Sequence, residues 1–133
     1  MNRAGQILLE LLVAIGVIVM TLVVIARLST KALSNSGFSN HQSVATGYSI
    51  AGMEWLRSQK DLDWVNINKS GTFCLNSLAW NSSCTPIAGI YTRKVDLTII
   101  LPGNNQVQAV VTVTWSEGTK SYSARQTAVF SRY

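Results

Sequence analysis

Residues 6–26 read QILLELLVAIGVIVMTLVVIA, an apolar run in which Glu10 and Thr21 are the main polar interruptions. As a helix, the roughly 20 residues from Ile7 to Ala26 rise about 1.5 Å each and reach about 30 Å, which is the thickness of the hydrocarbon core of a bilayer. The run therefore predicts a membrane-spanning helix. A chain with such a segment is not an ordinary cytosolic enzyme.

The composition of the whole chain indicates one globular unit with one accessory segment. The chain has 133 residues, of which 47% are hydrophobic and 13% are charged, and the apolar excess lies in the N-terminal run. The abundance of Val, Ile, Leu and Trp excludes an intrinsically disordered chain. The net charge of +5 comes from bases that are scattered among acids rather than arranged in a stripe, so we do not expect a nucleic-acid partner.

The sequence offers no constellation for catalysis, for a cofactor or for a metal. It has no glycine-rich phosphate-binding loop and no nucleophile elbow, and its single histidine, His41, is expected to be solvated. Asp61 and Asp63 lie where the chain leaves a helix for a loop, and lone carboxylates in loops are usually solvated rather than catalytic or bound to calcium. We therefore expect a protein that is not an enzyme and that holds no cofactor.

Three interpretations compete for the N-terminal run. A cleaved secretory signal has a shorter apolar core, of about 7–15 residues, and ends in a small-x-small cleavage site, which is missing here. A plain membrane anchor explains the length, and Arg3 before the run would keep the N-terminal end in the cytoplasm. An anchor does not explain Glu10, because a carboxylate inside a span costs up to about 3 kcal/mol and usually faces a partner. Glu10 therefore requires a cation from another group.

Residues 1–13, MNRAGQILLELLV, resemble the N-terminal signature of type IV pilins and the related pseudopilins. In that family a short basic leader ends in glycine, a prepilin peptidase cuts after it, the new first residue is N-methylated, and glutamate is the fifth residue of the mature chain. The resemblance implies a leader of residues 1–5, cleavage between Gly5 and Gln6, N-methylation of Gln6 and an assembly role for Glu10. The sequence departs from the family at Gln6, where phenylalanine is usual.

The assembly role has a physical basis in charge pairing. Cleavage would create an α-amino cation on Gln6, and a neighbouring subunit in a filament could place that cation beside Glu10. In a low-dielectric interior the loss of one partner of such a pair costs about 3–5 kcal/mol, so the pair can check the register of assembly. Apolar helices that pack side by side replace lipid contacts, and residues 6–26 then form the filament core without exposure to water.

Beyond the membrane run we expect the helix to continue as an amphipathic segment over residues 27–60. The stretch 34–43, SNSGFSNHQS, holds residues that compete for backbone hydrogen bonds, and whether the helix kinks or breaks there is left open. A helical period then resumes, and the face that we predict to pack against a sheet carries Val44, Tyr48, Ala51 and Trp55.

Residues 45–64, ATGYSIAGMEWLRSQKDLDW, are similar to PilV-like minor pilins. In those proteins a helix of small residues carries a glycine, a glutamate and an arginine among hydrophobic residues, followed by an acidic residue and a tryptophan. The matching residues here are Gly52, Met53, Glu54, Leu56, Arg57, Asp61 and Trp64. Glu54 and Arg57 are three positions apart, so on a helix they can also form a simple surface pair worth about 0.3 kcal/mol.

Residues 61–133 are expected to form a disulfide-containing loop and a sheet. Cys74 and Cys84 flank a polar stretch, and in an oxidising compartment they read as a disulfide that contributes roughly 2–3 kcal/mol through loop closure. Two buried thiols without a bridge are the alternative. A metal site needs about four ligands, and only the distant His41 could join the two cysteines, so we reject that interpretation.

Alternating apolar residues predict an antiparallel meander of three strands. The strands are expected over residues 95–101, 107–115 and 122–130, with turns at 102–105 and 117–119. One face of such a small sheet is apolar and needs cover, which the predicted helix face supplies. The expected fold class is therefore α+β, with a long N-terminal transmembrane helix packed on a small antiparallel sheet.

The resemblance implies a structural subunit, of the minor-pilin kind, in a type IV pilus-like filament. Its implied partners are the prepilin peptidase, other pilin subunits and the inner-membrane assembly platform, with membrane lipid around the helix before assembly. The protein would cross the cytoplasmic membrane once, with the C-terminal domain outside, and then enter an extracellular or periplasmic filament.

Three alternatives stay open at this point. A pseudopilin of a type II secretion or DNA-uptake system has a nearly identical N-terminus. A single-span envelope protein, from a different functional class, would bind a ligand through its outer domain and never polymerise. A domain that binds nucleic acid or a surface would require one basic face formed by Arg93, Lys94, Arg125 and Arg132.

Overall fold

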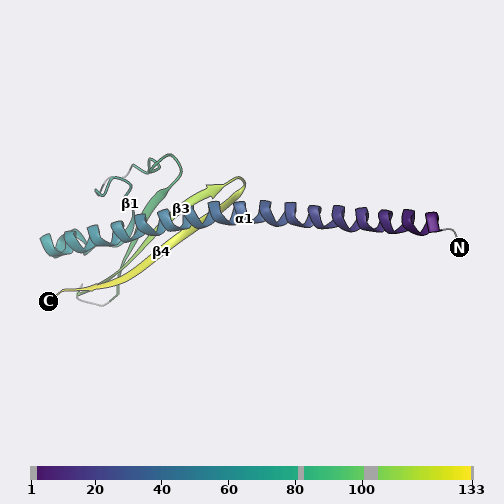
Figure 1. The fold of residues 1–133 in the computed structure, drawn as a ribbon. Helices are drawn as coiled ribbons and strands as arrows, with labels where there is room; N and C mark the ends of the chain where they lie inside the picture. Colours follow the sequence, from purple (N-terminus) through teal and green to yellow (C-terminus); the bar gives the residue numbers. More distant parts are fainter. Residues whose placement is uncertain (1–2, 81–82, 101–104, 133) are drawn as a thin grey trace. The chain divides into compact units, whose positions relative to one another are not determined.

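The computed structural model describes residues 3–80, 83–100 and 105–132, and it has the predicted α+β fold (Figure 1). The helix α1 (Arg3–Leu62) is followed by a short 3-10 helix η1 (Trp64–Asn66) and by the strands β1 (Gly71–Cys74), β2 (Thr92–Ile99), β3 (Gln106–Glu117) and β4 (Lys120–Ser131). Packing divides the chain into two units, of which the first ends at Asn40 and the second begins at His41.

The helix α1 is continuous through the stretch 34–43, where a kink or break had been left open. The chain has no proline before Pro86, and a single glycine such as Gly37 costs a helix only about 1 kcal/mol relative to alanine. Hydroxyl groups along the helix donate back to carbonyls of the preceding turn, as Thr46 does to Gln42 over 2.8 Å. The helix ends at Leu62, and the Asp63 side chain then accepts a hydrogen bond from the backbone N–H of Val65 and caps η1.

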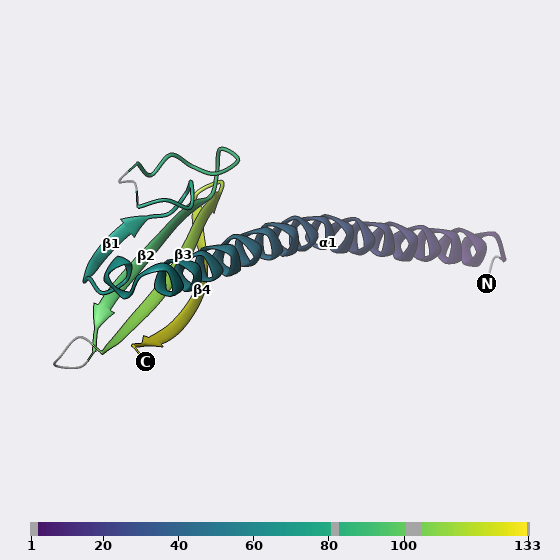
Figure 2. The same cartoon turned by 90° about the vertical axis from the view of Figure 1, so that its left-hand side faces the viewer.

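The four strands form one antiparallel sheet in the order β1-β2-β3-β4 (Figure 2). The three predicted strands are confirmed as β2, β3 and β4, although β2 begins three residues earlier than expected, at Thr92. The turn predicted over 117–119 is present, and Gly118 there has a φ of +61°, which glycine adopts without strain. Most of the other predicted turn, 102–105, lies outside the described residues.

The strand β1 was not predicted from the sequence. It is only four residues long, begins with Gly71 and pairs with β2 in the register Gly71 to Leu97. Four residues are too few for an alternating pattern that would distinguish a strand from a loop. It adds an edge strand beyond the expected meander.

The helix face that packs against the sheet is shifted by one position along the chain from the predicted face. Val44 is exposed and Ala51 is half-buried, whereas Tyr48 and Trp55 are half-buried and pack against the core, so the prediction was right only in part. The buried side of the helix instead carries Ala45, Ser49, Gly52, Met53 and Leu56. Gly52 lies directly against Arg93 and Val111 of the sheet, and Tyr48 and Trp55 pack beside the buried residues.

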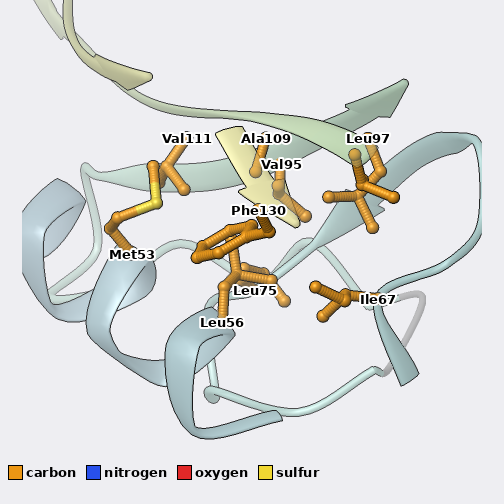
Figure 3. Close-up of a cluster of buried hydrophobic side chains, with 10 residues drawn as sticks. Met53, Leu56, Ile67, Leu75, Val95, Leu97, Ala109, Val111 and Phe130 are labelled. Atoms are coloured by element: carbon orange, nitrogen blue, oxygen red, sulfur yellow. The ribbon is translucent and has the colours of Figure 1, made fainter. Parts of the chain in front are cut away.

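The core of the second unit lies between this helix face and the sheet. In Figure 3, Met53 and Leu56 point from α1 into a cluster formed with the strand residues Val95, Ala109 and Val111. Leu56 and Val111 are fully buried, and each such side chain contributes about 1.5–3 kcal/mol through removal from water. A second cluster lies beside it and consists of Ala45, Tyr91, Val113, Trp115 and Ala124.

Candidate functional site

The first unit presents a continuous apolar surface. From Ile7 to Ile25 its large hydrophobic side chains are between 46% and 76% exposed, Val23 being the least and Met20 the most exposed. Within the described residues, α1 is the one helix that is long and apolar enough to cross a membrane. An apolar surface of this extent must be covered by lipid or by protein.

Hydroxyl groups in this helix are satisfied by its own backbone. Thr21 donates to the carbonyl oxygen of Val17, and Ser29 donates to that of Ile25 over 3.0 Å. Such bonds to the carbonyl four residues earlier let hydroxyl side chains enter a bilayer at little cost. The carboxylate of Glu10 differs, because no partner for it is present among the described side chains.

The expected processing residues and Glu10 lie close together along α1. Gly5, Gln6 and Glu10 are all helical and exposed, and the bond expected to be cleaved lies in the first turns of the helix. Gln6 and Glu10 are four residues apart and therefore share one helix face. The first two residues of the expected leader lie outside the described residues.

A disulfide joins Cys74, at the end of β1, to Cys84, the pair expected from the sequence. Their Cα atoms are 5.3 Å apart, within the usual range for a bridge. The bridge closes the start of the long connection between β1 and β2. Removal of the bridge would increase the conformational freedom of the unfolded chain and would thereby lower the stability of the folded unit.

Arg93 of β2 is a buried charged side chain, only 3% exposed. It donates from Nη1 to the carbonyl oxygen of Tyr48 on α1 over 2.9 Å, and from Nε and Nη2 to the carbonyl of Leu75. The backbone N–H of Arg93 also donates to Oδ1 of Asn76 over 2.7 Å. Burial lowers the pKa of the guanidinium, whose charge is balanced by carbonyl dipoles. Arg93 therefore ties the helix, the sheet and the connection after β1 together.

This position contradicts the proposed basic face, because Arg93 is inside the protein. Lys94 and Arg125 lie on the opposite, exposed side of the sheet and are separated by Thr112, with which both are in register. The alternation of β2 already contained the signal, since Arg93 shares the parity of the buried residues Val95 and Leu97. Because arginine is charged, Arg93 was expected on the surface in spite of this alternation.

His41 is not simply solvated, as had been expected. It is half-buried, and its Nδ1 lies 2.6 Å from the hydroxyl oxygen of Tyr91. Tyr91 is 4% exposed and packs edge-on against Tyr48, with ring centroids 5.4 Å apart. His41, in the first helical turn of the second unit, is thus joined to Tyr91, directly before β2, by a polar contact. The two residues are 50 positions apart, so the spacing of residues along the helix could not predict it.

A second anchor of the connection after β1 is Trp80. Its ring packs edge-on against Trp55 of α1, with centroids 4.9 Å apart, and its Nε1 donates to Oε1 of Gln59 over 3.3 Å. The Nζ of Lys69 lies 3.4 Å from the centroid of the same ring, a cation–π contact. Burial lowers the pKa of this ammonium group. These contacts hold the connection after β1 against the last turns of α1.

Neither metal chemistry nor a known relative explains these features. Among the described residues, no three side chains of His, Cys, Asp or Glu lie close enough together to hold a metal ion. Comparisons with protein-family models, with curated proteins and with solved structures find no match to this chain. The features that bear on function are the apolar helix surface, Glu10 and the disulfide-bonded second unit.

Proposed function

We propose that this chain is a structural subunit, of the minor-pilin kind, of a type IV pilus-like filament. It is inserted once in the cytoplasmic membrane with its second unit outside, is cleaved between Gly5 and Gln6 and N-methylated on Gln6 by a prepilin peptidase, and is then polymerised with other pilin subunits by an inner-membrane assembly platform. The observation that carries the proposal is Glu10, a carboxylate on an otherwise apolar, exposed helix surface.

Two hydrophobic environments, lipid and the helices of other subunits, can surround this helix, and only the second supplies a cation for Glu10. Lipid covers the apolar side chains of residues 6–26 but leaves the Glu10 carboxylate without a partner. A second subunit covers the same side chains and brings the α-amino group of its own Gln6 beside Glu10. Because the pair is buried, the loss of one partner costs about 3–5 kcal/mol, which is enough to exclude a subunit that is out of register.

The second unit supports the proposal in a different way. A disulfide-bonded unit is suited to an oxidising compartment outside the cytoplasm, which is where a filament subunit displays its globular part. The continuous helix α1 contributes both the apolar surface and the face that packs on the sheet, so a displayed domain is held on a filament core by one element.

The first test is the mass of the mature protein from a host with an active prepilin peptidase. We expect the chain to begin at Gln6, with or without one methyl group. A chain that still begins at Met1 in such a host contradicts the proposal.

The second test separates insertion from assembly. Glu10→Ala should insert into the membrane at least as well as the natural protein but be reduced at least tenfold in sheared filaments, whereas Thr21→Ala in the same helix should enter filaments normally. Glu10→Asp keeps the charge and should retain partial incorporation. If Glu10→Ala and Thr21→Ala behave alike and the protein remains single in the membrane, it is a non-polymerising envelope protein instead.

A further inference from the structure

One edge of the sheet lies along β4, in the second unit, and the short strand β1 forms the other. β4 pairs with β3 on one side, and no described strand pairs with it on the other. The N–H of Arg132 donates to the carbonyl of Asn105, which identifies the even-numbered residues of β4 as those that bond to β3. The backbone N–H and C=O groups of the odd residues therefore point away from the sheet. These residues are Ser121, Ser123, Arg125, Thr127, Val129 and Ser131.

A groove runs beside this edge, between β4 and the last turns of α1. It consists of two neighbouring hollows that share Arg57, and the larger one has a volume of about 290 Å³. On the helix wall Ile50 is 45% exposed and offers an apolar side chain, whereas Val129 at the rim of the strand wall is on the same face of the sheet as Arg125. The remaining lining residues are Met53, Glu54, Lys60, Asp61, Gln126, Ala128 and Phe130.

The charge along the edge points to one kind of occupant. Lys120 and Arg125 in β4 and Arg132 directly after it are basic, and this stretch contains no acidic residue. The helix wall of the groove is balanced, because Arg57 and Lys60 are offset by Glu54 and Asp61. The Arg125 side chain lies on the exposed face of the sheet, away from α1. A strand beside β4 would gain from acidic side chains on that face.

A second copy of this chain is a poor occupant. The antiparallel register that overlaps β4 fully with another β4 places Lys120 opposite Arg132 at both ends. Of the two neighbouring registers that keep the hydrogen-bonding parity, one places Arg125 opposite the Arg125 of the second copy. The other places Thr127 opposite Thr127, and there the repulsion is that between two edges that each carry three bases and no acid. Like charges directly opposite one another destabilise a strand pair.

We propose that the β4 edge binds an extended segment of another protein by strand addition, and that this segment alternates acidic and apolar residues. Its backbone continues the sheet through the outward groups of the odd residues. Its acidic side chains lie on the exposed face beside Arg125, and its apolar side chains enter the groove against Ile50 and Phe130. This surface belongs wholly to the second unit and does not depend on the function of the apolar helix.

The test uses the full chain in neutral detergent micelles at low salt and a fluorescent peptide of sequence EVEVEVEVE as the probe. We expect this peptide to bind at least tenfold more tightly than KVKVKVKVK. A copy of the acidic peptide with alternate backbone amides N-methylated, so that it cannot extend a ladder, should bind at least tenfold more weakly. Hydrogen exchange should slow at the amides of Ser123, Arg125, Thr127 and Val129 when the acidic peptide is bound.

Two variants locate the binding on the edge. Thr127→Pro removes an outward N–H without removing a bond to β3, so it should fold and weaken binding at least tenfold, whereas Thr127→Ala should bind normally. Arg125→Glu leaves the backbone intact and should reverse the preference toward KVKVKVKVK. Equal binding of both peptides, equal binding by the two Thr127 variants, or self-association that Thr127→Pro abolishes in place of peptide binding would each overturn the proposal.

Discussion

The guanidinium group of Arg93 donates two hydrogen bonds to the carbonyl oxygen of Leu75, from Nε over 2.9 Å and from Nη2 over 2.7 Å. A third donor of the same side chain, Nη1, reaches the carbonyl of Tyr48 on α1. A planar group with several fixed donors can satisfy carbonyls from two separate segments at once. The side chain of Arg93 therefore links the helix to the segment after β1.

Replacement of Arg93 should destabilise the second unit. Arg93→Met removes the side-chain donors to the carbonyls of Leu75 and Tyr48, which keep only their backbone donors, the N–H of Leu78 and the N–H of the next helical turn. We therefore expect a loss of about 1–3 kcal/mol in the free energy of unfolding. Arg93→Lys keeps the charge but not the fork of donors, and it should fall between the two. Urea unfolding of the full chain in micelles, followed by tryptophan fluorescence, measures the effect. Lys94→Met is the control and should change the free energy by less than about 0.5 kcal/mol.

Two glycines of α1 should respond to alanine in opposite directions. A Cβ on Gly52 would lie 2.9 Å from Cδ of Arg93 and 3.0 Å from Cγ1 of Val111, and Arg93 cannot move because its donors are engaged. We expect Gly52→Ala to destabilise the protein by about 1–3 kcal/mol. A Cβ on Gly47 meets nothing within 4 Å, so Gly47→Ala should stabilise the helix by about 0.5–1 kcal/mol. Thermal unfolding of the two variants decides this, and a shift of the same sign in both would contradict the contact at Gly52.

Stability should fall in alkaline solution because of Tyr91. Burial raises the pKa of this hydroxyl, and Tyr48 and Glu117 raise it further. A raised pKa in the folded protein means that the neutral form is favoured there, so this contribution is complete below the pKa of an unfolded tyrosine, about 10, and is lost as pH rises above it. The difference in unfolding free energy between the natural protein and Tyr91→Phe should therefore shrink between about pH 9 and pH 11. A difference that stays constant or grows with pH would show that the hydroxyl is not held neutral.

Loss of the disulfide should weaken the second unit without unfolding it. In the chain-entropy account a bridge over a loop of this length contributes about 2–3 kcal/mol. The connection after β1 is also held by Arg93 and by Trp80, which contacts Trp55 and Gln59. The double variant Cys74→Ala, Cys84→Ala should thus keep its near-ultraviolet circular dichroism in the absence of denaturant while its urea midpoint falls. A flat spectrum at zero denaturant would mean that the bridge alone holds the connection in place.

The sequence by itself determined the features that depend on local pattern. An apolar run of about 20 residues is long enough to predict a membrane-spanning helix. Alternation of apolar residues predicted β3 and, more weakly, β4, together with the turn at Gly118, because a strand places successive side chains on opposite faces. Two cysteines separated by a short polar stretch were sufficient to indicate their bridge. Glu10 could be identified as well, because it is a charged residue within an apolar run.

Tertiary structure alone decided which of these residues meet. The buried helix face lies one position further along the chain than predicted, and on it Gly52 packs directly against Arg93 and Val111, which come from strands far along the chain. The burial of Arg93 likewise depends on carbonyls of Leu75 and Tyr48, which are separated from it by 18 and 45 positions. The hydrophobic pattern of a sequence indicates which side chains prefer water. It does not indicate which distant carbonyl can accept the hydrogen bonds that a buried side chain no longer donates to water. Only the packed structure supplies the partner.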